Sequence, residues 1–193
     1  MQHVMFQLTE RQQQILLQIA RESVRSYLAA ELRPCPEFSS GVLNEPHGIF
    51  VSIHKGRNLR GCIGNVHPAA PLYRSAAECA IAAAVGDPRF MPLTLAELPL
   101  VDFEISILSA VERIENIGEI EIGIHGLLIS KKGARGLLLP QVAPAYGWDR
   151  EKLLQETCRK AGLKSDDWKE GAAIYRFCAL VFGETQFHLT TNS

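Results

Sequence analysis

Long apolar runs are missing from this sequence of 193 residues: no stretch approaches the roughly 20 residues that a membrane-spanning helix needs. A surplus of charge is missing too, because 20 Lys and Arg residues stand against 21 Asp and Glu residues. This balance provides no bulk attraction to nucleic acid or to an anionic membrane. The segment Met1 to Arg11 is polar, so no secretory signal is expected. We therefore expect neither a nucleic-acid partner nor a membrane partner.

Paired cysteines are absent as well. The five cysteines are odd in number, widely spaced and without a Cys-x-x-Cys pair, so no disulfide framework is expected. Reduced thiols fit the cytoplasm, which is the predicted location. The six histidines form no His-Glu-x-x-His pattern, and none lies at zinc-finger spacing from a cysteine, so no metal site is predicted. Neither a complete dinucleotide fingerprint nor a phosphate-binding loop is present, and no cofactor is predicted.

The composition, with 47% hydrophobic and 21% charged residues, is that of one globular domain or two small lobes. Apolar residues at three- and four-residue steps predict a helix from Glu10 to Leu32, which Pro34 stops. An alanine-rich segment predicts a helix over Pro71–Val85, and a third helix is predicted over Trp148–Ala161. These helices separate the β-regions of the chain.

Five β-regions are predicted from β-branched residues and alternating polarity, over residues 48–54, 59–64, 101–108, 119–139 and 172–182. The first two are joined by a short turn and form a hairpin. Strands come in groups separated by helices, not in strict alternation with them. The predicted fold class is therefore α+β, with a largely antiparallel sheet flanked by helices.

Cys62 is the first candidate for chemistry. It follows Arg60 and Gly61 and precedes Gly64, in a strand where the backbone carries few side chains. A guanidinium nearby favours the thiolate, the form that attacks carbonyl groups. Amides around the two glycines would bind an anion or an oxyanion if their N–H groups converge. The alternative interpretation is that Cys62 is a small buried hydrophobic residue.

Glu104 and His125 complete a hypothetical catalytic set. Glu104 interrupts an otherwise apolar strand, and His125 precedes a glycine at a strand bend. In this hypothesis Cys62 is the nucleophile, His125 the base and Glu104 the group that orients it. The alternatives are a solvated strand face for Glu104 and a histidine satisfied by backbone hydrogen bonds for His125.

Two further charged groups have a structural and a functional interpretation. In the turn Asp87-Pro88-Arg89, Asp87 accepts backbone N–H groups, and Arg89 either supports the turn or binds an anion of the substrate. The cluster Lys131, Lys132 and Arg135 is interpreted as a solvated hairpin tip.

The segment Leu59-Arg60-Gly61-Cys62-Ile63-Gly64 resembles the signature of the AMMECR-one domain family, whose prokaryotic members are called AmmeMemoRadiSam system protein A. The chain departs from the family where Met91 replaces a second proline and where His54 replaces a common lysine. The further matches follow the family's order and are Gly48–Ile53, Asp87–Phe90 with Pro92-Leu93, Glu104–Leu108, Gly123–Leu127, Leu139–Ala143, Cys158–Leu163, Tyr175–Phe177 and Phe182–Glu184.

This resemblance implies one compact domain over residues 16–184, with a larger and a smaller lobe and a cleft near the signature strand. Residues 1–15 would be a lead-in with the start of the first helix, and residues 185–193 a C-terminal tail. The family has no settled activity. Its prokaryotic members are associated with a radical-SAM protein and a MEMO-type protein, which are the expected pathway partners.

Two functions of different classes follow. The first is cysteine-dependent acyl or group transfer by Cys62, His125 and Glu104, with Arg60, Gly61, Gly64 and Arg89 binding the substrate. The second is a non-catalytic binding or adaptor module for a small anion, a peptide or a protein, in which the two glycines serve only close packing. A redox role ranks third because no second cysteine lies nearby in the sequence.

Overall fold

The strands of the computed structural model, which describes residues 7–31, 35–68 and 70–187, form two four-stranded sheets. Each sheet belongs to one of two units. Of the described residues, those from 7 to 107 and from 180 to 187 form the larger unit, and Leu108–Ala179 form the smaller one. The predicted α+β class with a larger and a smaller part is confirmed, whereas the strands form two sheets and not one.

The sheet of the larger unit has the order β2-β1-β3-β8. Its strands are β1 (Ile49–Lys55), β2 (Asn58–Asn65), β3 (Asp102–Leu108) and β8 (Ala179–Gly183). The predicted hairpin is β1 with β2, and β1 also pairs antiparallel with β3. The register between β1 and β2 shifts at Ile53/His54, where a bulge inserts one residue into β2.

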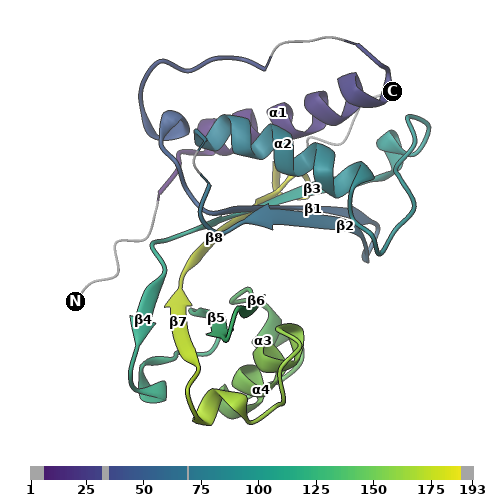
Figure 1. Ribbon diagram of the computed structural model, residues 1–193. Helices are drawn as coiled ribbons and strands as arrows, with labels where there is room; N and C mark the ends of the chain where they lie inside the picture. The colour runs from purple at the N-terminus through teal and green to yellow at the C-terminus, as the bar shows by residue number, and fades with distance from the viewer. Residues whose placement is uncertain (1–6, 32–34, 69, 188–193) are drawn as a thin grey trace. The chain divides into compact units, whose positions relative to one another are not determined.

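Helices α1 (Glu10–Leu28) and α2 (Leu72–Val85) lie side by side on one face of this sheet (Figure 1). Ile49, Val51 and Ile53 of β1 point toward the helices and are fully buried in the core of the unit. Because side chains alternate along a strand, Phe50, Ser52 and His54 lie on the opposite face.

Helix α1 ends at Leu28, four residues before the predicted end. Ala30 adopts a left-handed backbone with φ of 54°, and the Glu31 N–H donates to the Ser26 carbonyl at 2.8 Å. This six-residue closure ends the helix without proline. Pro34, the predicted stop, lies outside the described residues. At the other end, Thr9 caps the helix, and Thr9 and Gln12 bond each other reciprocally.

The sheet of the smaller unit has the order β4-β7-β5-β6. Its strands are β4 (Glu112–Ile114), β7 (Ala173–Phe177), β5 (Gly126–Lys131) and β6 (Ala134–Leu138). Helix α4 (Arg150–Lys160) packs on β5 and β6 and follows the single-turn helix α3 (Val142–Ala145). The smaller unit has a separate hydrophobic core, which includes Leu127, Ile129, Leu154 and Cys158. The described residues also form the 3₁₀ turns η1 (Val42–Asn44), η2 (Leu98–Leu100), η3 (Ile117–Glu119), η4 (Asp167–Lys169) and η5 (Glu184–Phe187).

The last predicted strand, residues 172–182, is two strands in different sheets. The break falls at Cys178, where the chain leaves β7 and enters β8. There the Cys178 N–H donates to Ser109 Oγ, and the Cys178 carbonyl accepts the Ser109 N–H, both at 2.9 Å. The region 119–139 likewise contains a helical turn before β5 and β6. Because β-propensity is high throughout residues 172–182, the sequence does not show where the chain passes from one sheet to the other.

None of the helices in the described ranges is long and apolar enough to cross a membrane.

Candidate functional site

Cys62, Ser52 and Glu104 occupy directly paired positions on three neighbouring strands. Ser52 of β1 faces Cys62 of β2 on one side and Glu104 of β3 on the other. Directly paired residues of an antiparallel sheet have Cβ atoms about 4.5–5.5 Å apart on the same face. The structure thus brings two of the predicted catalytic residues into one row, on the sheet face opposite α1 and α2.

The middle of this row is a hydrogen bond to sulfur. Ser52 Oγ donates to Cys62 Sγ at 3.3 Å, and Ser52 is 7% exposed. Cys62 itself is half-buried. Sequence reasoning did not include Ser52, because only the strand register shows which residue faces Cys62.

The backbone of Cys62 is bound by the turn that follows α2. Strand β2 is an edge strand, and the outward N–H of Cys62 donates to Asp87 Oδ2 at 2.9 Å. Arg89 Nη2 donates to the Cys62 carbonyl at 3.3 Å and to Asp87 Oδ2 at 2.6 Å. The Arg89 guanidinium makes the largest contribution to holding the pKa of the Asp87 carboxyl well below its usual range. The backbone N–H groups of Cys62 and Arg89 lower this pKa further. The turn thus fixes the position of the candidate nucleophile.

Arg60 is bound within the protein through all three of its nitrogens. Nη1 donates to the Met91 carbonyl at 2.7 Å, and Nη2 to Glu97 Oε2 at 3.2 Å and to the Pro92 carbonyl at 3.4 Å. Nε completes a two-point contact with Glu97 at 3.4 Å. These bonds attach the segment from Met91 to Glu97 to β2. Arg89, whose side chain is 54% exposed, is the more accessible guanidinium near Cys62.

The two glycines of the signature segment permit close packing. A Cβ built on Gly61 would lie 2.1 Å from the carbonyl oxygen of Ala83 in α2. On Gly64 it would lie 2.3 Å from the ring of Phe50, the residue directly opposite. Both glycines therefore have a structural role that larger residues do not fill.

Glu104 is half-buried, and among the described residues its carboxylate has no hydrogen-bond or ion-pair partner. On its far side Gly183 of β8 leaves space, because a Cβ there would lie 3.7 Å from Glu104 Cβ. The carboxylate is therefore available to a substrate or to a transferred proton.

His125 lies in the smaller unit, whereas Cys62 and Glu104 lie in the larger one. It is 1% exposed, and its Nδ1 accepts the Glu121 N–H at 3.0 Å. The His125 N–H in turn donates to the Glu121 carbonyl at 2.9 Å. These bonds close the turn before β5. They are the backbone contacts of the structural interpretation, and the base role of His125 stays a prediction.

His54 and Asp102 share the face of the Cys62–Ser52–Glu104 row. His54 lies two residues after Ser52 in β1 and pairs directly with Asp102 of β3. Its Nε2 is buried, and among the described residues it has no hydrogen-bond partner. Neither residue was predicted as part of the site, because His54 was noted only as a departure from the family pattern.

Cys62 differs from the other four cysteines in its surroundings. Burial raises the pKa of the Cys35, Cys158 and Cys178 thiols, and it raises that of Cys79 to about 11. Among the described residues, no serine or threonine hydroxyl donates to any of these four sulfurs, whereas Ser52 donates to Cys62.

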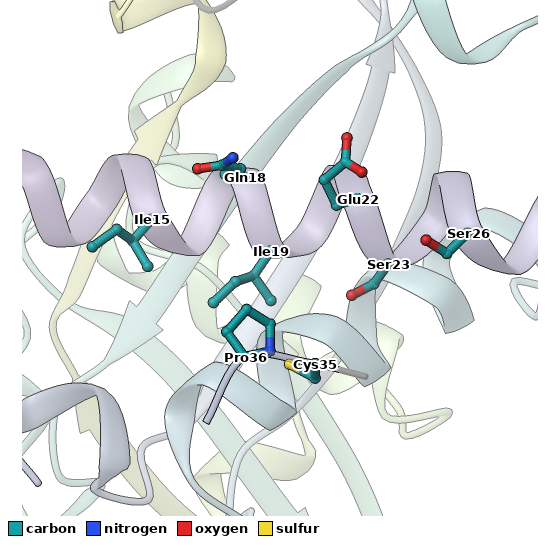
Figure 2. A pocket seen from close by; sticks show the side chains of 8 residues that line it. All are labelled: Ile15, Gln18, Ile19, Glu22, Ser23, Ser26, Cys35 and Pro36. Carbon is teal, nitrogen blue, oxygen red and sulfur yellow. The ribbon is translucent and has the colours of Figure 1, made fainter. Parts of the chain in front are cut away.

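No group of three or more His, Cys, Asp or Glu side chains in the described parts of the chain could hold a metal ion. A cavity of about 370 Å³ lies elsewhere in the larger unit, between α1 and the segment that carries Cys35 and Pro36. Figure 2 shows Ile15, Ile19 and Ser23 pointing from α1 toward that segment. None of the predicted site residues lines this cavity.

Known proteins resemble this chain over most of its length. A Thermofilum pendens protein is 42% identical over 190 residues, which cover 89% of each chain. Protein MJ0810 of Methanocaldococcus jannaschii is 44% identical over 179 residues, covering 86% of this chain and 87% of that protein. The crystal structure of uncharacterized protein PH0010 from Pyrococcus horikoshii matches with a TM-score of 0.87 and 36% identity, covering 92% of this chain and 94% of that one. The sequence profile of the AMMECR1 family matches residues 17–182, so the resemblance is confirmed and the chain belongs to the AMMECR1 family.

Proposed function

We propose that this protein performs cysteine-dependent acyl or group transfer with Cys62 as the nucleophile. The observation that carries the proposal is the hydrogen bond from Ser52 Oγ to Cys62 Sγ, within the row that ends at Glu104. The thiolate attacks an acyl carbonyl, a thioester forms, and the leaving group departs with a proton. A second nucleophile then takes the acyl group and regenerates the thiol.

Three features of the site support this chemistry. The hydroxyl of Ser52 donates to Cys62 Sγ at 3.3 Å and so orients the sulfur within the row. The Asp87–Arg89 turn fixes the Cys62 backbone, so that the sulfur position is set before substrate binds. Arg89, with its half-exposed guanidinium, is suited to bind a carboxylate or phosphate of the substrate.

Alkylation of the native protein with iodoacetamide tests the proposal, with the labelled peptides quantified by mass spectrometry. Cys35 is the internal comparison, because it is also half-buried but burial raises the pKa of its thiol. We expect Cys62 to label about tenfold faster than Cys35 at pH 7. Incubation with a small acyl thioester should then add the acyl mass to Cys62 and leave the Cys62→Ser variant unmodified.

Equal labelling of Cys62 and Cys35 would overturn the catalytic proposal. The second hypothesis, a non-catalytic binding or adaptor module, would then explain why the Asp87–Arg89 turn binds the edge of β2 and why Gly61 and Gly64 are closely packed.

The pathway partners are a separate proposal that family membership supports. A radical-SAM protein and a MEMO-type protein from the same organism should co-purify with this chain or alter the Cys62 labelling rate when added. If the added proteins neither co-purify with this chain nor change the Cys62 labelling rate at micromolar concentrations, the partner assignment is wrong. The alkylation result does not depend on this outcome.

A further inference from the structure

We propose that His54 accepts the proton of the Cys62 thiol through the Ser52 hydroxyl, with Asp102 positioned behind the imidazole. This inference rests on the proposed function, since it names the base of the same site. It replaces a base from the smaller unit with one that the larger unit itself provides.

Strand geometry places the four residues together. Ser52 and His54 are alternate residues of β1 and point to the same face. Cys62 lies opposite Ser52, and Asp102 lies opposite His54. His54 and Cys62 are diagonal neighbours across the β1–β2 pair, a separation of about 7–8 Å that long and aromatic side chains span. Ser52 Oγ lies in the row between them.

The burial of His54 Nε2 gives independent support. Buried nitrogen atoms almost always have a hydrogen-bond partner, and one that lacks it among the described residues calls for an explanation. A ring nitrogen that takes up a proton during a reaction needs a free lone pair beforehand. The bulge in β2 lies directly opposite His54, and bulges commonly re-aim side chains beside active sites.

The proton moves in two connected steps. In this structure the Ser52 hydroxyl donates to Cys62 Sγ, so it first rotates toward His54 Nε2. The S–H bond of Cys62 then breaks and its proton passes to Ser52 Oγ, as the hydroxyl proton of Ser52 passes to His54 Nε2. The products are a thiolate, an intact serine and an imidazolium. No oxidant or further reactant is needed, and the imidazolium later returns the proton to the leaving group.

The charged groups around His54 lie on the two strands that flank it and on β1 itself. Asp102 pairs with it from β3, and Glu104 lies diagonally on the same strand. Lys55 follows it in β1, but its side chain is half-exposed and its Nζ pairs with Glu97 Oε1 at 3.6 Å. Strand β2 contributes Cys62, with the Asp87–Arg89 pair at its backbone, and the bulge residue Arg60, whose guanidinium is bound to Glu97 at 3.2 Å. Strand β8 carries no titratable side chain. Two carboxylates thus face the imidazole from the strand packed against it.

The test is the pH dependence of Cys62 alkylation by iodoacetamide in the wild type and in His54→Gln. We expect the variant to label Cys62 about tenfold more slowly at pH 6.5, and at the wild-type rate at pH 10, where both thiols are ionised. The exposed His67→Gln is the matched control and should leave the profile unchanged. Cys35 labelling in the same samples reports whether the fold is intact.

A second measurement tests the His54 assignment without the His54→Gln variant, in case that variant does not fold. The ring proton of His54 is followed by NMR against pH in the wild type and in Cys62→Ser, and its midpoint should move by at least half a pH unit between them. An unchanged midpoint, or equal profiles for His54→Gln and wild type, overturns the His54 assignment. Rapid Cys62 labelling in the same experiment would leave the proposed function standing.

Discussion

Cys62 is held through its main chain as well as through its sulfur. Its N–H and carbonyl point away from β1, and without partners they would be exposed at the sheet edge. Asp87, which is 4% exposed, accepts the N–H, and Arg89 donates to the carbonyl. The turn therefore supplies the hydrogen bonds that a further strand would otherwise provide.

Replacing Asp87 with Asn should lower the stability at pH 7 by about 2 kcal/mol, because hydrogen bonds to a charged partner are lost. The pKa of the Asp87 carboxyl is lower in the folded protein than in the unfolded chain. Its contribution is therefore fully present above the unfolded value of about 4 and is lost as the pH falls toward the folded value. Urea unfolding at pH 7 and pH 3 measures the difference.

The gap between wild type and Asp87→Asn should narrow at pH 3. A gap of the same size at both pH values would show that the carboxylate charge contributes nothing, and that the turn is held by shape alone.

At the scale of secondary structure, α1 is tied to the end of β8 by a buried ion pair. Arg21 donates through Nε and Nη2 to both carboxylate oxygens of Glu184, at 2.5 and 2.6 Å. The remaining contacts connect two more elements: Arg21 binds the carbonyls of Leu98 and Val101, and Glu184 accepts the Phe103 N–H. The cluster joins α1, the turns η2 and η5, and strand β3.

Glu184→Gln should destabilise the protein by about 3–5 kcal/mol, because it leaves the Arg21 charge buried without a countercharge. Glu37→Gln is the matched control: Glu37 pairs with Arg74 at 3.2 Å, but its side chain is 80% exposed. Its loss should cost less than about 1 kcal/mol. Thermal and chemical unfolding compare the two. Equal effects would mean that the Arg21–Glu184 pair is no more than a surface contact.

The elements themselves were predictable, whereas the site was only partly so. The apolar stripe of α1, the alanine run of α2 and the β1–β2 hairpin follow from local patterns. The row through Ser52 does not, because strand register is a long-range property that brings Cys62 and Glu104 to the same residue. His54 was overlooked for the same reason.

Arg60 shows a second limit of sequence reasoning. Its position two residues before Cys62 predicted an anion-binding role, but the partners that it binds are 31 to 37 residues away. Local sequence cannot show that a guanidinium is already engaged. For Gly61, by contrast, the predicted close backbone approach is present against α2.

At the scale of the whole molecule, each sheet has a core of its own. The residues of each core belong to a single unit. Leu154→Ala, at a fully buried position of α4, should cost about 2–5 kcal/mol. Amide hydrogen exchange should then accelerate in β5, β6 and α4 more than in β1, β2 and β3.

Equal acceleration throughout both sheets would show that the two cores unfold as one. The matched substitution Leu16→Ala, at a fully buried position of α1, should give the opposite pattern if the cores open separately.

Among the described residues, the smaller unit is a single segment inserted between two neighbouring strands. The chain leaves after β3 and returns into β8, and Ser109 and Cys178 bond each other at the two crossings. The entropy cost of closing a chain segment grows only slowly with its length. A shorter or longer segment between these two crossings should therefore leave the strand order β2-β1-β3-β8 unchanged.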